Sequence, residues 1–226
     1  MADWRLIIDP PGGPEANMAS DEKIARQVQE RAAPPTLRIY RWSRPAVSLG
    51  RRQKPETLPS DIHEKSLPLV RRPTGGGAVL HSMDELTYAV AVLPSMIPAG
   101  VRLSAVPGRI HHFLRERLVL TGAVSADDLV LATSDSGGSY AVCFSAPVAG
   151  DLSFLGKKAA GSALRVWKEA VLIQGSVQGI PVKQEDLQGA LMSAVEKIFG
   201  RAEGMGEIEW CRGGELNPDE LTPTTP

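Results

Sequence analysis

The sequence predicts an α+β fold, a single domain in which helices flank a mixed and largely antiparallel sheet. Two observations support this prediction. Many short segments with alternating or β-branched residues are separated by turns, and only three or four segments have helical periodicity. The regular alternation of strand and helix that a doubly wound fold requires does not occur. The 226 residues, 42% of them hydrophobic, are enough to form one large core.

The first half of the chain is expected to contain several strands and one long helix. The strands share alternating apolar residues or a bounding proline, and they are expected at 3–9, 36–42, 46–49, 78–81 and 86–93. The last two of these are expected to pair with each other. A helix over 16–31 is ended by Pro34-Pro35, and the polar stretch 51–66 is expected to be a loop.

The second half begins with a helix that Ser104 is expected to cap and that runs to about residue 118. A last helix is predicted over 185–199, and Gly200 lies where a helix-ending glycine belongs. Short strand-like segments lie between the two helices, at about 127–131, 140–145, 151–155, 158–166 and 170–177. A single domain is expected to span 1–212, and the polar, proline-rich segment 213–226 is expected to be a loose tail.

Composition excludes several classes of function. The formal net charge of −1 gives no basic excess for binding nucleic acid. No apolar run approaches the roughly 18 residues of a membrane-spanning helix. The residues Met1 to Arg5 lack a signal pattern, so we expect a cytoplasmic protein without a membrane partner. Cys143 and Cys211 do not suggest a disulfide framework, and no histidine or cysteine spacing indicates a metal site.

A run of three glycines is the first segment that could carry chemistry. Arg71 and Arg72 lie just upstream of Gly75, Gly76 and Gly77. Such a run suits a place where another group lies against the main chain, and its backbone N–H groups together with the arginines could bind an anion. A hairpin loop beside two solvated arginines explains the same residues, and the residues alone do not decide between the two.

A lysine among small residues and a lone cysteine form the second and third candidates. Lys158 precedes Ala159-Ala160-Gly161-Ser162 and could polarise a carbonyl or hold a thiolate, although it could also be a surface lysine. Cys143 could be a nucleophile, or a buried and inert thiol on a strand. His111 and His112 are expected on a solvated helix face because arginines flank them.

These segments together resemble the lipoate–protein ligase and octanoyltransferase family. The resemblance rests on R-R-P-T-G-G-G-A-V-L-H with E-L-T-Y, on G-K-K-A-A-G-S-A-L-R, on N-M-A-S-D-E, and on R-W with A-V-S-L-G-R-R-Q. Order and spacing agree from about residue 3 to residue 200. Cys143 stands in a C-F-S-A-P context, 15 residues before Lys158, which is similar to the branch of octanoyltransferases that depends on cysteine.

The resemblance implies a fold shared with biotin–protein ligases and a set of site residues. Cys143 and Lys158 would be catalytic. The acyl group or acyl-adenylate would contact a further set: Arg72, Gly75, Gly76, Gly77, Ala78, Val79, His81, Gly161 and Ser162. Two positions depart from the family pattern. Gln174 stands where a histidine is usual, and Leu164 replaces a polar residue, which puts the acyl group and the acceptor in question.

The resemblance also implies a reaction and its partners. Acyl carrier protein would donate an octanoyl or lipoyl group to Cys143, with Lys158 stabilising the thiolate and relaying a proton. The acceptor would be a lysine of a lipoyl-carrier domain, in a glycine-cleavage carrier protein or a 2-oxoacid dehydrogenase subunit. This reading needs no cofactor. The alternatives are an ATP-dependent lipoate ligase that uses ATP and Mg²⁺, and a non-catalytic module that binds acyl carrier protein.

Overall fold

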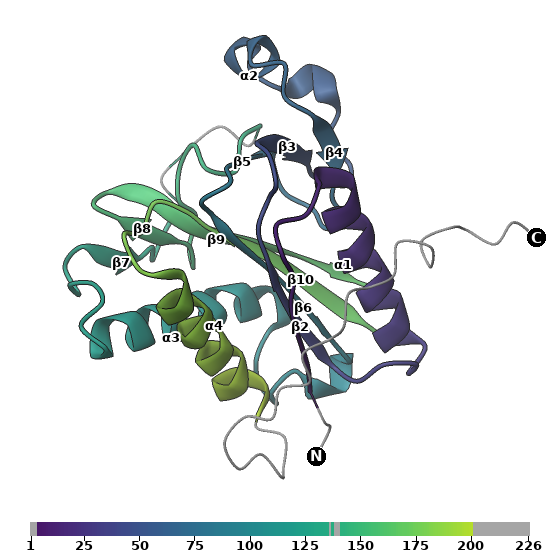
Figure 1. Ribbon diagram of the computed structural model, residues 1–226. Helices are drawn as coiled ribbons and strands as arrows, with labels where there is room; N and C mark the ends of the chain where they lie inside the picture. The colour runs from purple at the N-terminus through teal and green to yellow at the C-terminus, as the bar shows by residue number, and fades with distance from the viewer. Residues whose placement is uncertain (1–3, 136, 138–140, 201–226) are drawn as a thin grey trace, which may run out of the picture.

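The computed structural model describes residues 4–135, 137 and 141–200, and within them two sheets hold all the strands (Figure 1). The large sheet has seven strands in the order β1-β2-β6-β10-β9-β8-β7, and the small sheet has three in the order β4-β3-β5. The strands of the large sheet are β1 (Arg5–Ile8), β2 (Thr36–Tyr40), β6 (Leu86–Val92), β7 (Leu129–Leu131), β8 (Leu152–Phe154), β9 (Lys157–Val166) and β10 (Val171–Val177). Those of the small sheet are β3 (Ala46–Leu49), β4 (Leu69–Arg71) and β5 (Val79–His81).

Strand pairing confirms the predicted α+β class with a mixed, largely antiparallel sheet. In the large sheet only β1 and β2 run parallel, and the other neighbours are antiparallel. In the small sheet β3 pairs in parallel with β4 and antiparallel with β5.

Helices cover both faces of the large sheet (Figure 1). The helix α1 (Pro14–Gln29) packs on one face, where β6 offers the small residues Ala89 and Ala91. The helices α3 (Val106–Leu120) and α4 (Gln184–Phe199) pack on the other face, against larger side chains such as Tyr88 and Val90 of the same strand. Because successive side chains point to opposite faces, β6 separates two cores and is buried along its whole length.

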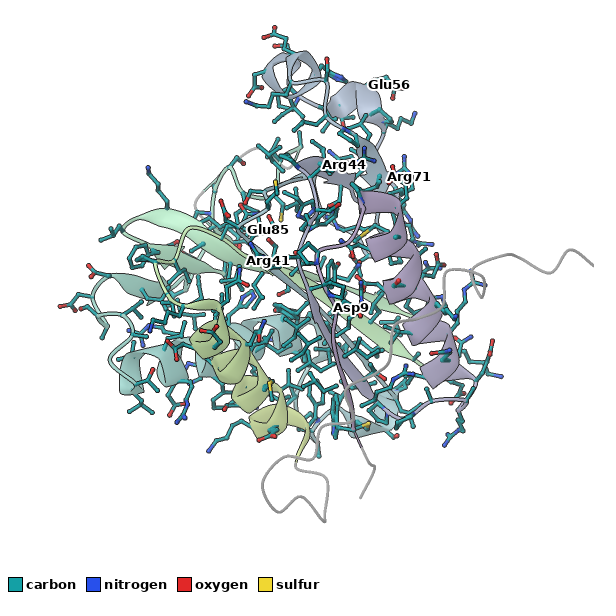
Figure 2. The ribbon with its side chains drawn as sticks, in the orientation of Figure 1. Asp9, Arg41, Arg44, Glu56, Arg71 and Glu85 are labelled. Carbon is teal, nitrogen blue, oxygen red and sulfur yellow. The ribbon has the colours of Figure 1, made fainter. Side chains whose placement is uncertain are left out.

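The predicted pairing of 78–81 with 86–93 is wrong. The strand β5 pairs with β3 in the small sheet, whereas β6 pairs with β2 and β10 in the large one. The intervening turn contains Glu85, which lies between the two sheets (Figure 2). Its carboxylate is hydrogen-bonded to His81 of β5 and to Thr87 of β6. The turn between β5 and β6 therefore connects the two sheets, and its Glu85 side chain is hydrogen-bonded to residues of both strands. The alternation of residues alone had suggested a hairpin.

Two other local predictions also need correction. Ser104 does not cap a helix, because residues 103–105 form a 3₁₀ turn (η3, Leu103–Ala105) and α3 begins at Val106 without a side-chain cap. The stretch 51–66 is not only loop. It holds a 3₁₀ turn (η1, Pro55–Thr57) and the short helix α2 (Ser60–Glu64), because its buried Leu58 and Ile62 pack in one cluster with Val47 and Leu49 of β3. A further 3₁₀ turn (η2, Pro94–Met96) follows β6.

The last helix ends as predicted. Gly200 has a φ of 86°, and its N–H donates to the carbonyl of Glu196. The tail 213–226, the end of the expected domain and Cys211 lie outside the described residues. Within the described part of the chain, no helix combines the length and the apolar character needed to cross a membrane.

A β-bulge in β9 decides where Lys158 lies. Leu152 pairs with Ala160 and Ser153 with Lys158, so Ala159 is an extra residue opposite β8. Beyond the bulge, Ala160 and Leu164 face α3 and α4, whereas Gly161 lies on the opposite side. Lys158 joins Gly161 on that side, because a Cβ built at Gly161 would come within 2.8 Å of the Lys158 Cε atom.

Candidate active site

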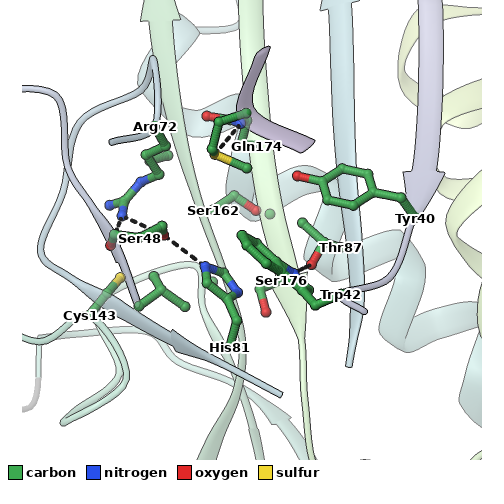
Figure 3. Close-up of a pocket in the computed structure, with 15 residues that line it drawn as sticks. Tyr40, Trp42, Ser48, Arg72, His81, Thr87, Cys143, Ser162, Gln174 and Ser176 are labelled. Carbon is green, nitrogen blue, oxygen red and sulfur yellow. Dashed lines mark hydrogen bonds between the residues drawn. The ribbon is translucent and has the colours of Figure 1, made fainter. Parts of the chain in front are cut away.

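A pocket lies between the small sheet and the large sheet, on the side away from α3 and α4 (Figure 3). The space between its side chains amounts to about 390 Å³, solvent at the mouth included. Most lining surface is apolar, with a few polar side chains pointing in. Its polar and ionisable lining residues include Ser48, Arg72, His81, Cys143, Ser162 and Gln174.

The thiol of Cys143 belongs to a turn, and the backbone of the residue after the glycine run holds that turn in place. The N–H of Cys143 donates to the carbonyl of Ala78 at 2.7 Å, and the N–H of Ala78 donates to Ala141 at 2.9 Å. Gln53 Nε2 donates to the same Ala141 carbonyl. Cys143 is half-buried and carries no disulfide. Two segments that are far apart in sequence thus meet at the mouth of the pocket.

The ammonium of Lys158 meets this turn directly. Its Nζ donates to the carbonyl of Cys143 at 2.7 Å and lies 3.6 Å from the sulfur. It also forms an ion pair with Asp151 Oδ2 at 2.6 Å. Gly161 makes this arrangement possible, because any side chain there would collide with the lysine. The two residues that the sequence suggested as catalytic are therefore in contact.

Asp151 is a site residue that the sequence reasoning missed. Its carboxylate is buried, and it accepts from the N–H of Val148 at 2.8 Å as well as from Lys158. A buried carboxylate needs such partners, because an isolated charge in the interior is costly. The sequence did place an acidic residue, Asp151, directly before the strand that leads to Lys158. No pattern in the sequence, however, indicated that Asp151 and Lys158 are paired.

Arg72 and the glycine run fit together in a way that differs from the expected anion site. The guanidinium donates to the carbonyls of Gly75 and Gly77 and, through Nη1, to the carbonyl and hydroxyl of Ser48. All three of its nitrogens are therefore occupied by protein acceptors. Burial lowers the pKa of Arg72 to about 10, with a charge on Cys143 acting in the opposite direction. The glycine carbonyls, and not their N–H groups, are turned toward this cation.

The conformation of the loop explains why glycine is needed within it. Gly76 has a φ of 87°, a region that other residues rarely adopt. Its carbonyl oxygen lies against Gly50, where an added Cβ would come within 1.9 Å of that oxygen. Gly75, Gly76, Gly77 and Ala78 do not line the pocket, whereas Arg72, Val79, His81, Gly161 and Ser162 do.

His81 connects the small sheet with the interior through both of its ring nitrogens. Its Nε2 lies 2.7 Å from Ser48 Oγ, and its Nδ1 lies 2.6 Å from Glu85 Oε1 (Figure 3 shows the bond to Ser48). The ring also stacks on Trp42, with the ring centroids 3.8 Å apart. Ser48, His81 and Glu85 are all buried. His81 therefore has one orientation, with Nε2 facing the pocket.

His111 is not on a solvated face, as its flanking arginines suggested, but is buried beneath the pocket. Its Nδ1 donates to the carbonyl of Gly150 at 2.6 Å, and its Nε2 lies 2.7 Å from Ser162 Oγ. Tyr88 OH lies 2.5 Å from the same Ser162 oxygen. Burial lowers the pKa of His111 and raises the pKa of Tyr88, because the interior disfavours both charged forms. His112, the next residue, is exposed as predicted.

The two departures from the family pattern have separate structural settings. Gln174 accepts from Thr74 Oγ1 at 2.7 Å and donates to Asp21 Oδ2 at 2.6 Å, so it ties the loop before the glycine run to α1. Leu164 packs against the core that contains α3 and α4, on the opposite side of β9 from the pocket. Only Gln174 therefore reaches the pocket.

No metal centre is visible within the described ranges. Among these residues, no three or more histidine, cysteine, aspartate or glutamate side chains gather closely enough to hold a metal ion.

The chain matches proteins of lipoate metabolism. Residues 13–222 match the family model of the lipoyl protein ligase A/B catalytic domain. Octanoyltransferase LipM from Moorella thermoacetica is 37% identical over 207 residues, which are 88% of this chain and 72% of that protein. Octanoyltransferase LipM from Brevibacillus brevis is 35% identical over 190 residues, 78% of this chain and 66% of that protein. The chain thus spans about two thirds of the length of these relatives.

Solved structures share the fold at lower identity. A lipoate-protein ligase A bound with ATP superposes with a TM-score of 0.63 at 22% identity, over 91% of this chain and 90% of that chain. A bipartite lipoate protein ligase from Thermoplasma acidophilum gives 0.61 at 20% identity, over 92% and 89%. These likenesses agree with the expected lipoate-ligase-like fold.

Proposed function

Because the chain belongs to the lipoyl protein ligase A/B catalytic domain family, we propose that it transfers an octanoyl or lipoyl group to a protein lysine through a thioester on Cys143. The names of the curated relatives support octanoyl transfer in protein lipoylation. The observation that carries the finer proposal is the contact of Lys158 with Cys143, with 3.6 Å between Nζ and Sγ at the edge of an apolar pocket.

The first half of the reaction forms the acyl-enzyme. The Cys143 thiolate, stabilised by the Lys158 ammonium, attacks the carbonyl carbon of the acyl thioester and forms a new carbon–sulfur bond. Lys158, whose Nζ lies 3.6 Å from the sulfur, would also stabilise the substrate oxygen that becomes negative in this step. When the original carbon–sulfur bond breaks, the leaving thiolate takes a proton from Lys158, which becomes a neutral amine.

The second half releases the acyl group to the acceptor. A neutral lysine amine attacks the thioester carbonyl, and its surplus proton goes to neutral Lys158, which becomes ammonium again. The carbon–sulfur bond breaks, and the Cys143 thiolate returns to its starting state. Asp151, whose Oδ2 lies 2.6 Å from Nζ, would hold Lys158 in place during this cycle.

The pocket supports a medium-length acyl chain as the group transferred. Its lining is largely apolar and includes Met18, and Figure 3 shows the rings of Tyr40 and Trp42 at the end remote from Cys143. Burial of apolar surface there would contribute roughly 25 cal/mol for each Å² removed from water. We propose acyl carrier protein as the donor and a lipoyl-carrier domain as the acceptor. The proposed reaction needs no cofactor, whereas a ligase would need ATP and Mg²⁺.

Intact-protein mass spectrometry tests the proposal. The full chain is incubated with octanoyl-acyl carrier protein and without ATP, then treated with neutral hydroxylamine, which cleaves thioesters. We expect one octanoyl adduct that hydroxylamine removes and that is absent from Cys143→Ser. The Lys158→Ala variant should form the adduct at least roughly 100-fold more slowly, since it loses its proton relay. Lys157→Ala, which changes the exposed neighbouring lysine, is the matched control and should behave like wild type.

The same experiment separates the alternatives. Pyrophosphate release that requires ATP and free lipoate, and that survives Cys143→Ala, would replace this proposal with a ligase. Binding of acyl carrier protein without any covalent adduct or pyrophosphate release would favour a non-catalytic module.

A further inference from the structure

Ser48 has the hydrogen-bonding environment of an activated serine. Its hydroxyl oxygen lies 2.7 Å from His81 Nε2, and His81 Nδ1 lies 2.6 Å from Glu85 Oε1. A nucleophile in contact with a base, and a base oriented by a third group, is the arrangement of serine acyl-transfer enzymes. We propose that Ser48, His81 and Glu85 form a second acyl-accepting centre in this pocket, which takes medium-chain acyl groups from thioesters and activated esters.

The protonation pattern of this centre follows from its hydrogen bonds. The carboxylate of Glu85 accepts from Thr87 and Ser176 hydroxyls, from the Ser82 N–H and from Gln178 Nε2, in addition to His81. A carboxylate with so many donors around it acts as an acceptor only. The hydrogen of His81 therefore lies on Nδ1, and its Nε2 is free to accept. Ser48 consequently donates its hydroxyl hydrogen to Nε2, as a serine nucleophile does.

The position of the base is fixed from all sides. Its ring stacks on Trp42 at a centroid distance of 3.8 Å, and Trp42 Nε1 donates to Thr87 Oγ1, which in turn donates to Glu85. Such a chain leaves His81 little freedom to turn away from Ser48. A fixed base lowers the cost of reaching the reactive geometry.

A cation also faces the reacting oxygen. Arg72 Nη1 donates to Ser48 Oγ at 3.2 Å and to the Ser48 carbonyl at 2.9 Å. Positive charge at this distance would stabilise the negative charge that develops on Oγ as its proton moves to His81. Ser48 and His81 both line the same pocket as Cys143, so an acyl chain bound there is within the reach of both nucleophiles.

The proposed step balances without another reactant. Ser48 Oγ attacks the acyl carbonyl carbon and forms an ester bond, while its proton passes to His81 Nε2. The bond from that carbon to the leaving sulfur or oxygen breaks, and the leaving group takes the proton back from the imidazolium. The donor can be a bound thioester or the thioester on Cys143, and the product is an oxygen ester on Ser48.

The experiment uses the full chain as Cys143→Ala, so that the first nucleophile is absent. The protein is mixed with p-nitrophenyl octanoate, quenched in acid over a time course and digested with trypsin. We expect one octanoyl group on the peptide that contains Ser48, resistant to neutral hydroxylamine because it is an oxygen ester. Adding Ser48→Ala should abolish this adduct. Adding His81→Gln should slow its formation at least roughly 100-fold, and adding Ser60→Ala, at an exposed serine, should change nothing.

Circular dichroism and urea unfolding of each variant establish that it is folded. If folded Cys143→Ala protein shows no acyl group on Ser48, or if His81→Gln acylates Ser48 at an unchanged rate, the proposal is wrong. Its outcome is independent of the proposed function. Acylation of Cys143 in the wild type can succeed where Ser48 fails, and Ser48 can react in a chain whose Cys143 does not.

Discussion

Asp151 and Lys158 form an ion pair in which Oδ2 and Nζ are 2.6 Å apart, with side chains that are 6% and 2% exposed. The same Nζ contacts the carbonyl and the sulfur of Cys143. The pair therefore couples the stability of the fold to the position of the proposed proton relay.

We predict that Asp151→Asn lowers the free energy of unfolding by about 3 kcal/mol, because it leaves a buried ammonium without its counter-charge. The rate of Cys143 acylation should fall as well, since the lysine is no longer held. Urea unfolding and the acylation time course measure the two effects. Asp127→Asn, at an exposed aspartate, is the control and should stay within about 0.5 kcal/mol of wild type. An unchanged stability for Asp151→Asn would show that the pair contributes nothing.

His111 predicts a pH dependence of stability. Its pKa is lowered in the fold, first by burial, with Lys158 adding to this and Gly150 and Asp151 opposing it. The unfolded chain, with an ordinary histidine pKa of about 6.5, therefore binds more protons than the fold as the pH falls. Stability should be lost as the pH drops through about 6.5, and His111→Gln should lose less over the same interval.

Urea unfolding at several pH values between about 5 and 8 measures this difference. His112→Gln is the matched control, because it removes an exposed histidine from the adjacent position of the same helix. Equal pH slopes for His111→Gln and wild type would contradict the prediction.

Two glycines are expected to respond in opposite directions to alanine. At Gly50 the new Cβ would lie 1.9 Å from the carbonyl oxygen of Gly76, which is backbone and cannot move aside cheaply. Gly50→Ala should lower the free energy of unfolding by about 3 kcal/mol and impair acylation. Gly189 lies within α4 with nothing near its Cβ position, so Gly189→Ala should raise stability by about 0.5–1 kcal/mol. Thermal unfolding compares them directly.

Gln174→Glu should destabilise the protein in a manner that depends on pH. Its Nε2 donates to Asp21 Oδ2 at 2.6 Å, and burial already raises the pKa of Asp21. A second carboxylate there would have a raised pKa of its own, so the loss of stability should grow as the pH rises above about 4.3. Urea unfolding at about pH 5 and pH 8 measures it. A loss that does not grow with pH would rule out the charge explanation, and Gln188→Glu on α4 is the control.

Periodicity predicted most helices and strands and the mixed sheet, because burial of one face leaves a regular trace in the sequence. Helix α1, for example, shows its buried Ile24, Ala25 and Val28 at helical spacing. The sequence contains no comparable pattern that indicates which strands pair with each other. The strands β5 and β6 each show strand-like alternation of residues, yet they belong to different sheets. The turn that connects them holds Glu85 in hydrogen bonds between the sheets and does not form a hairpin.

The site was predicted in part for a similar reason. Motif resemblance singled out Cys143 and Lys158, which the structure brings into contact. Ser48 and the buried state of His111 were missed because each depends on partners that are distant in sequence, and Asp151 was missed because no sequence pattern pairs it with Lys158. His111 meets Ser162, 51 residues away, and no local pattern distinguishes it from its exposed neighbour His112.

The single extra residue in β9 limits what can be concluded from intact motifs in a related sequence. The bulge at Ala159 shifts the alternation of side chains along β9 by one residue. It is therefore the bulge, and not the identity of any functional side chain, that determines which side of the sheet Lys158 occupies. If the same residues paired as a regular strand without the bulge, every reactive group would be retained, yet the Lys158 ammonium would point toward the helices. A change that removes the bulge without shortening the strand can therefore abolish activity while the motifs still appear intact.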